Sequence, residues 1–205
     1  MSYAGGTTGT HPLMDDAGII LPIVSDVLEK HDIPYFVGGS AASSVYGPPR
    51  TTQDVDFIVD LTPESLPRLS KSFETEFHID EQAAMEAVLS RDMFNVIHKE
   101  TMYKADMHIL PEGEWGKVQL LRRVWFPMGP GTGSSPIAFA SPEDTVLAKL
   151  RWYRLTGERS DKQWGDILGV LRQQRARLDR DYLLEWGDRL ELSQQLVKAL
   201  DEAGI

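Results

Sequence analysis

The stretch Val37–Asp60, "VGGSAASSVYGPPRTTQDVDFIVD", sets two glycines and a serine a short distance before two aspartates separated by one valine. Side chains alternate across a strand, so polar and apolar residues fall on opposite faces. The polar face carries Asp54, Asp56, Ile58 and Asp60, and the apolar face carries Val55, Phe57, Val59 and Leu61. We predict a strand over Val55–Leu61 with a buried apolar row and two carboxylates that repel each other unless a cation lies between them.

The two carboxylates have a functional and a plain interpretation. Two residues along a strand span about 6.6 Å, so Asp54 and Asp56 can converge on metal ions about 3.5–4 Å apart, the spacing used in phosphoryl displacement. Most aspartates are simply exposed surface residues, and a short Asp-x-Asp pattern alone does not exclude that.

The glycine turn adds a second signal. Gly38 and Gly39 lack β-carbons, so their backbone N–H groups can approach an anion closely. We expect Ser40 to cap a short helix over Ala41–Tyr46, whose first N–H groups and dipole favour a phosphate. Gly-Gly-Ser is also common in ordinary loops, but turn and carboxylates together indicate an anion cradle beside a metal site.

Gly38-Gly39-Ser40 followed by Asp54-Val55-Asp56-Phe57 resembles the signature of the nucleotidyltransferase superfamily with the DNA polymerase beta-like fold. The stretches "GGSAASSVYGPPRTTQDVDF", "SPEDTVLAKLRWYR" and "ERSDKQWGDILGVL" are similar to one branch, the bacterial nucleotidyltransferases related to abortive-infection toxins. The resemblance covers roughly residues 33–171.

The resemblance implies a third carboxylate on a neighbouring strand, matched here by Asp106 in "YKADMHIL". Asp54, Asp56 and Asp106 would be the catalytic residues and would hold Mg²⁺, or Mn²⁺ in its place, with the triphosphate of an NTP. Asp106 would also help deprotonate the incoming hydroxyl. The alternative is a surface aspartate on an edge strand that shares its face with Lys104 and His108.

The resemblance also suggests cations for the nucleotide, beside Gly38, Gly39 and Ser40. Lys149 leaves its helix about 60° from Val146 and could reach over the rim of a cleft; it could equally be a lysine that only extends along the surface. The branch has an acidic residue further on, matched by Asp161 or Asp166. Arg50 contacts the nucleotide or supports the loop.

The pattern predicts an α/β (α+β) protein: a mixed nucleotidyltransferase-type sheet flanked by helices, then a mostly helical C-terminal part. We expect a disordered lead-in over 1–12, an α/β domain over 13–140 and a helical subdomain over 141–205. The segment "GPGTGSSP", Gly129–Pro136, is either an interdomain linker or a hairpin tip. Further helices are expected over Ala17–His31, from Thr62 toward Phe77, over Glu81–Leu89 and from Ser141 to Gly157, and further strands over Tyr35–Val37, Phe94–His98 and Tyr103–Leu110.

Composition sets limits on the protein's class. The chain has 205 residues, no cysteine and a net charge of −10, which argues against disulfides and thiolate metal sites and against a wide basic surface for duplex nucleic acid. No signal peptide or membrane-length apolar run is visible, so a cytoplasmic protein is expected. His98 and His108 lack the spacing of a transition-metal site. The five tryptophans are expected to cover the core.

Two functional hypotheses follow. The first is a metal-dependent nucleotidyltransferase that moves NMP from an NTP to a hydroxyl of an RNA 3′ end, a protein or a small molecule such as an aminoglycoside. As a toxin-like enzyme it could have an antitoxin or other partner protein. The second is a catalytically silent member that binds a nucleotide or a partner, which loss of the third carboxylate would indicate.

Overall fold

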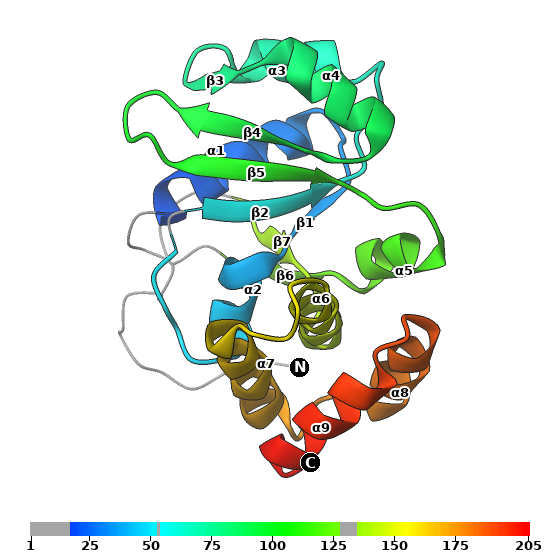
Figure 1. Ribbon diagram of the computed structural model, residues 1–205. Coiled ribbons are helices and arrows are strands. Elements are labelled where there is room, and N and C mark those ends of the chain that lie inside the picture. Colours follow the sequence, from blue (N-terminus) through cyan, green and yellow to red (C-terminus); the bar gives the residue numbers. More distant parts are fainter. Residues whose placement is uncertain (1–16, 53, 128–134) are drawn as a thin grey trace.

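The computed structural model describes residues 17–52, 54–127 and 135–205, and the lead-in expected over 1–12 lies outside them. The described chain forms a seven-stranded sheet of order β3-β4-β5-β2-β1-β7-β6 with helices packed around it (Figure 1). The strands are β1 (Tyr35–Val37), β2 (Asp54–Val59), β3 (Phe77–Ile79), β4 (Met93–His98), β5 (Lys104–Ile109), β6 (Val124–Phe126) and β7 (Ile137–Phe139). The helices are α1 (Ala17–Lys30), α2 (Gly39–Tyr46), α3 (Leu66–Phe73), α4 (Glu81–Ser90), α5 (Glu114–Arg122), α6 (Pro142–Leu155), α7 (Asp161–Gln174), α8 (Arg180–Arg189) and α9 (Ser193–Ala203).

The sheet is mixed, as predicted. β2 runs parallel to β5 and antiparallel to β1, and β1 runs parallel to β7. The remaining pairs, β3–β4, β4–β5 and β6–β7, are antiparallel. β2 and β5 therefore lie side by side in the middle of the sheet, with their polar residues at matching positions.

The alternation in β2 has the predicted consequence. Val55, Phe57 and Val59 are completely buried, and so are Ala105 and Met107 on β5. These side chains belong to a core shared with α1, α3 and α4. The opposite face of β2 and β5 is left for polar side chains.

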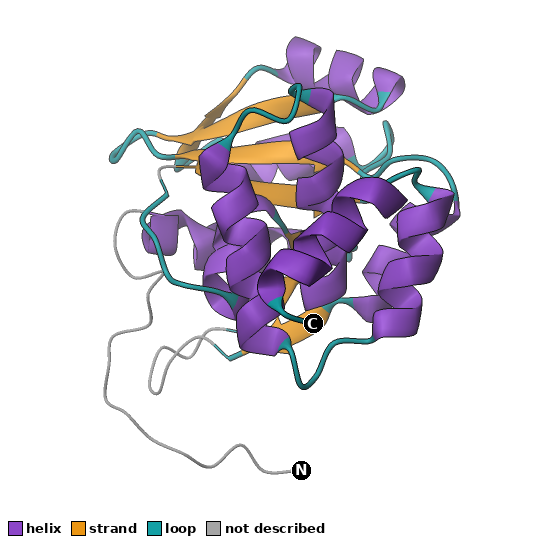
Figure 2. Cartoon of the chain, turned by 60° about the horizontal axis from the view of Figure 1, so that its bottom comes forward, coloured by secondary structure: helices purple, strands orange, loops and turns teal. Residues whose placement is uncertain are grey.

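A second hydrophobic cluster is formed mainly by α6–α9 and also includes Tyr46 of α2 and Trp115 of α5. Figure 2 shows these helices grouped together beside the strands. The C-terminal part is therefore helical, as expected, but it packs on elements of the front half. The domain boundaries at 12/13 and 140/141 stay predictions. Among the described residues, no helix has the length and apolar character needed to cross a bilayer.

Several element predictions need correction. Ser40 does not cap α2, because the helix begins at Gly39, two residues before the predicted start at Ala41, and Gly38 is its N-cap. The helix predicted toward Phe77 ends at Phe73, and Phe77 starts β3 instead. The prediction also missed α5.

The segment Gly129–Pro136 joins two paired strands, because β6 and β7 pair antiparallel. This arrangement matches the hairpin interpretation and not the interdomain linker. Its residues 129–134 lie outside the described part of the chain.

The expectation that all five tryptophans cover the core is wrong for two of them. Trp115 and Trp186 are buried, but Trp125 is 43% exposed and Trp152 is 58% exposed.

Candidate functional site

Asp56 and Asp106 lie directly opposite each other on the adjacent parallel strands β2 and β5. The same register pairs Asp54 with Lys104. Because side chains alternate, all four residues project from the face of the sheet away from the core formed by Val55 and its neighbours. The parallel pairing thus brings together the three carboxylates that the sequence singled out.

The glycine turn between β1 and α2 lies against Asp56. The Gly38 N–H donates to the Asp56 carbonyl oxygen at 2.9 Å. Gly39 has a φ of +52°, and a β-carbon added there would lie 1.7 Å from Asp56 Oδ2. Only glycine fits this position without moving the carboxylate, so the backbone at the start of α2 and the Asp56 side chain share one site.

A second group of charges joins the loop before β2 to the C-terminal helices. The Arg50 Nε donates to Asp166 Oδ1 at 3.2 Å and its Nη2 donates to Oδ2 at 3.1 Å. The Lys149 Nζ donates to Asp166 Oδ2 at 2.8 Å. The Arg50 Nη2 also hydrogen-bonds the Ser40 hydroxyl. Arg50 therefore supports the loop, as one of the two sequence interpretations held.

Burial and hydrogen bonding act in opposite directions on the charged groups around Asp166. Burial lowers the pKa of Lys149, and the hydrogen bond to Asp166 opposes that shift. Burial acts to raise the pKa of Asp166, but the hydrogen bonds from Arg50 and Lys149 outweigh it, so this pKa lies below its usual value. Of the two acidic candidates on α7, Asp166 is thus the one at the site. Asp161 is exposed in the first turn of the helix.

Comparison with known proteins gives the fold a family context. No family model and no curated protein matches this chain. A crystal structure of an antigenic nucleotidyltransferase-like protein from Paracoccidioides brasiliensis is similar over 92% of this chain and 93% of that one, with 17% identity and a TM-score of 0.54. The solution structure of the antibiotic-resistance factor ANT(2'')-Ia is similar over 92% and 95%, with 12% identity and a TM-score of 0.51. The chain has the nucleotidyltransferase fold.

At these identities the likeness establishes the nucleotidyltransferase fold and leaves the reaction and the toxin-type branch as predictions. The predicted fold class is confirmed. The site residues are brought close to one another by this fold from three places in the chain: the turn after β1, the strand pair β2–β5, and helices α6 and α7.

The carboxylates of Asp54, Asp56 and Asp106 repel one another. Burial raises the pKa of Asp106, and the negative charges of Asp56 and Asp54 raise it further. Asp106 Oδ1 is buried and has no hydrogen-bond partner. An unpartnered buried carboxylate oxygen beside a like charge is costly, and its chemistry fits a cation ligand.

In the described ranges, no three His, Cys, Asp or Glu side chains are already grouped to hold an ion. His108 Nε2 lies 3.2 Å from Asp56 Oδ1, and this hydrogen bond raises the pKa of His108 against the effect of burial. The three carboxylates fit a divalent cation in their chemistry and would have to turn toward it.

Two features of the site were not predicted. The contact of His108 with Asp56 was missed, although the alternation along β5 had placed His108 on the same face as Asp106. The bridge from Arg50 to Asp166 was also missed, because the two residues are 116 positions apart and no local pattern connects them. His98, by contrast, is buried with its Nδ1 against the Thr101 hydroxyl at 2.8 Å, as a structural histidine would be.

Proposed function

We propose that this protein is a metal-dependent nucleotidyltransferase that moves NMP from an NTP to an acceptor hydroxyl. The observation that carries the proposal is the pairing of Asp56 with Asp106 on adjacent strands, with the Gly39 backbone against Asp56. A catalytically silent member would lack the third carboxylate, whereas this chain has Asp106 at that position.

Asp54, Asp56 and Asp106 would hold Mg²⁺, or Mn²⁺ in its place, together with the triphosphate. Carboxylate and phosphate oxygens are the ligands that Mg²⁺ prefers, and the ion would neutralise charge on the phosphates and the leaving pyrophosphate. Gly38 and Gly39 would offer backbone N–H groups to the triphosphate, as glycine turns at helix starts do.

Arg50, Lys149 and Ser40 would bind the triphosphate beside the glycine turn. Asp166 holds both cations, which reduces the conformational entropy lost when the phosphates bind. The resulting arrangement of fixed charges, rather than covalent chemistry by the protein, would supply most of the catalysis.

In the reaction, the acceptor oxygen forms a bond to the α-phosphorus while the bond from that phosphorus to the bridging oxygen breaks, and pyrophosphate leaves. The acceptor hydroxyl must lose a proton. Asp106 would help to accept it, because it lies opposite Asp56 on the adjacent strand and so beside the reacting phosphate.

The experiment is a labelling assay with Mg²⁺ and each of the four labelled NTPs in a cell extract. Wild type should label an acceptor, and Asp56→Asn should abolish labelling. Asp60→Asn is the matched control, because Asp60 is an exposed aspartate just beyond the same strand and should leave labelling unchanged. Equal labelling by wild type and Asp56→Asn would refute the enzyme proposal.

The acceptor, the nucleotide base, the toxin-type role, an antitoxin partner and a cytoplasmic location stay predictions. The labelling assay bears on the first two directly. An acceptor in the RNA, protein or small-molecule fraction of the extract would identify the substrate class.

A further inference from the structure

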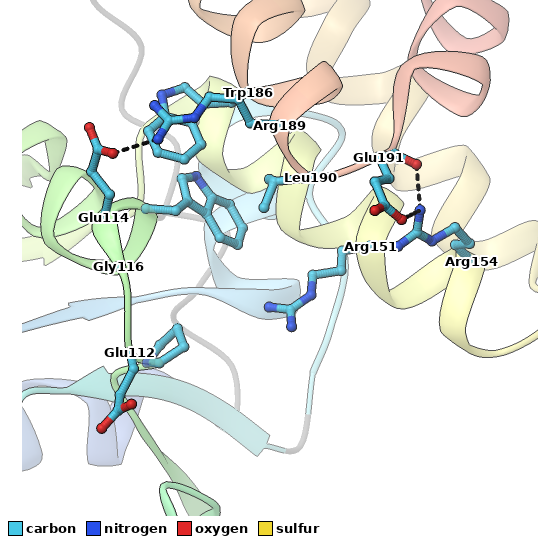
Figure 3. Close-up of a pocket in the computed structure, with 11 residues that line it drawn as sticks. Glu112, Glu114, Gly116, Arg151, Arg154, Trp186, Arg189, Leu190 and Glu191 are labelled. Atoms are coloured by element: carbon cyan, nitrogen blue, oxygen red, sulfur yellow. Dashed lines mark hydrogen bonds and ion pairs between the residues drawn. The ribbon is translucent and has the colours of Figure 1, made fainter.

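A pocket of about 400 Å³ lies between α5, α6 and α8 and the loop after β5. This volume is within the range of small-molecule sites. Trp115 and Trp186 form buried walls, and both are held in place: the Trp115 indole N–H donates to Asp144, and the Arg189 guanidinium covers the Trp186 ring at 4.0 Å. The pocket therefore has two tryptophan side chains in a lining that is otherwise mostly charged (Figure 3).

This pocket is distinct from the candidate catalytic site. Arg151, which lines it, follows Lys149 by two residues on α6, so the two side chains leave the helix about 200° apart. Lys149 reaches Asp166 on α7 from one side of α6, whereas Arg151 faces α5 and α8 on the other. Pro111 also lines the pocket. It is five residues beyond Asp106, and five residues of extended chain span up to about 16 Å.

The acidic residues of the pocket are already neutralised. Each of its three glutamates has an arginine partner: Glu112 with Arg91, Glu114 with Arg189, and Glu191 with Arg154. Figure 3 shows the last two pairs as dashed lines at the margins of the pocket. These pairs cancel their charges locally and leave little negative potential inside.

Arg151 differs from the other charged residues of the lining. Its side chain extends into the space between Leu190 and Glu112 (Figure 3), and it forms no ion pair with any residue in the described ranges. Arg151 is itself exposed, but it lines a pocket beside two buried tryptophans in a protein with a net charge of −10. The pocket therefore has one positive charge without a counter-ion.

We infer that this pocket is a binding site for a phosphate-bearing ligand, with Arg151 as the phosphate contact. A guanidinium presents a planar fork of donors that matches a phosphate with two parallel hydrogen bonds. The indole walls and Leu190 suit the flat or apolar part of the same ligand. A polycationic molecule such as an aminoglycoside would instead meet a like charge.

Two sources can supply this chemistry: a small phosphorylated molecule, or the phosphodiester of a single nucleic-acid strand. The probes are ribose 5-phosphate and a five-residue single-stranded oligonucleotide, titrated into the full chain by calorimetry at low salt, where surface charge is least screened. Binding of only one probe identifies the source. Binding of neither at millimolar concentration overturns the inference.

The variants locate the site. Arg151→Ala should weaken binding of the probe about 10-fold, since a hydrogen bond to a charged group contributes about that factor, and Arg151→Lys should retain part of the affinity. Arg68→Ala is the matched control, because it removes the same charge from an exposed position on α3, across the sheet. Equal affinity of Arg151→Ala and Arg68→Ala would overturn the assignment.

The outcome is independent of the proposed transferase activity. Asp56→Asn, which should abolish NMP transfer, should bind the probes as wild type does. Loss of probe binding in Asp56→Asn with no loss in Arg151→Ala would place the probe at the carboxylates and overturn the inference. An aspartate-rich peptide with the same charge as the phosphate probe is the competitor. If this peptide binds more tightly than the probe and displaces it, the pocket does not prefer phosphate and the inference is refuted.

Discussion

Replacing Gly39 by alanine tests whether the glycine turn and Asp56 form one site. The new β-carbon would lie 1.7 Å from Asp56 Oδ2, whereas such contacts are essentially never shorter than 3.0 Å. The carboxylate oxygen would therefore have to move by at least 1.3 Å, the difference between these two distances. The Asp56 side chain can make this movement by rotating, so the clash should affect activity more than folding.

The two effects have separate magnitudes. A φ of +52° costs an alanine about 1–2 kcal/mol, which for a chain of this size lowers Tm by about 2–8 °C. Displacing a catalytic group by about 1 Å can lower the rate by about 100-fold. We expect Gly39→Ala to be folded at 25 °C and to lose at least that factor in NMP transfer.

Gly157→Ala is the control that separates strain from displacement. Gly157 also has a positive φ, +78°, but a β-carbon there meets nothing within 4 Å. Thermal unfolding by circular dichroism should show similar losses for both variants, while the labelling assay should show a loss only for Gly39→Ala. If Gly39→Ala transfers NMP as well as Gly157→Ala does, the proposed contact between turn and carboxylate has no functional role.

Two further predictions concern charge. Asp166→Asn should destabilise the protein by about 2 kcal/mol, because Arg50 and the buried Lys149 would lose their shared counter-ion. Urea unfolding measures this change. The control is Asp161→Asn, on the exposed first turn of the same helix, which should change stability by less than about 1 kcal/mol. Asp106→Asn should raise Tm at pH 7. The pKa of Asp106 is higher in the folded protein than the ordinary value of 3.8, so the ionised carboxylate destabilises the fold. This loss of stability develops as the pH rises from 3.8 through the folded-state pKa. The gain should vanish below about pH 4, where the carboxyl is protonated in both states; a gain that persists or grows in acid would contradict the assigned cause.

The local pattern was sufficient where a strand has one buried face. The period of two in β2 and β5 indicated which residues would be buried, and Val55, Phe57 and Met107 are indeed fully buried. What the pattern does not contain is the register, because β2 and β5 are about 50 residues apart along the chain. The direct pairing of Asp56 with Asp106 follows from that register.

The errors occurred where tertiary contacts outweigh local preference. Serine is a favoured N-cap, yet Ser40 lies inside the first turn, because the helix begins at Gly39 with Gly38 as its N-cap. The Ser40 hydroxyl instead accepts a hydrogen bond from Arg50. The missed strand β3 has only three residues, and no proline or glycine separates it from the end of α3.

Contacts from the C-terminal helices also hold the candidate site. The Gln174 side chain on α7 donates to the carbonyl of Tyr46 at the end of α2, at 2.8 Å. Pro48 packs so closely on the same helix that a β-carbon at Gly169 would lie 2.5 Å from its Cδ. Arg50 then reaches Asp166, so three contacts tie α7 to the end of α2 and the loop that leads into Asp54. The strand pairing and the Gly38 turn position the carboxylates from within 13–140, and α7 adds contacts to the loop before Asp54 from outside that segment.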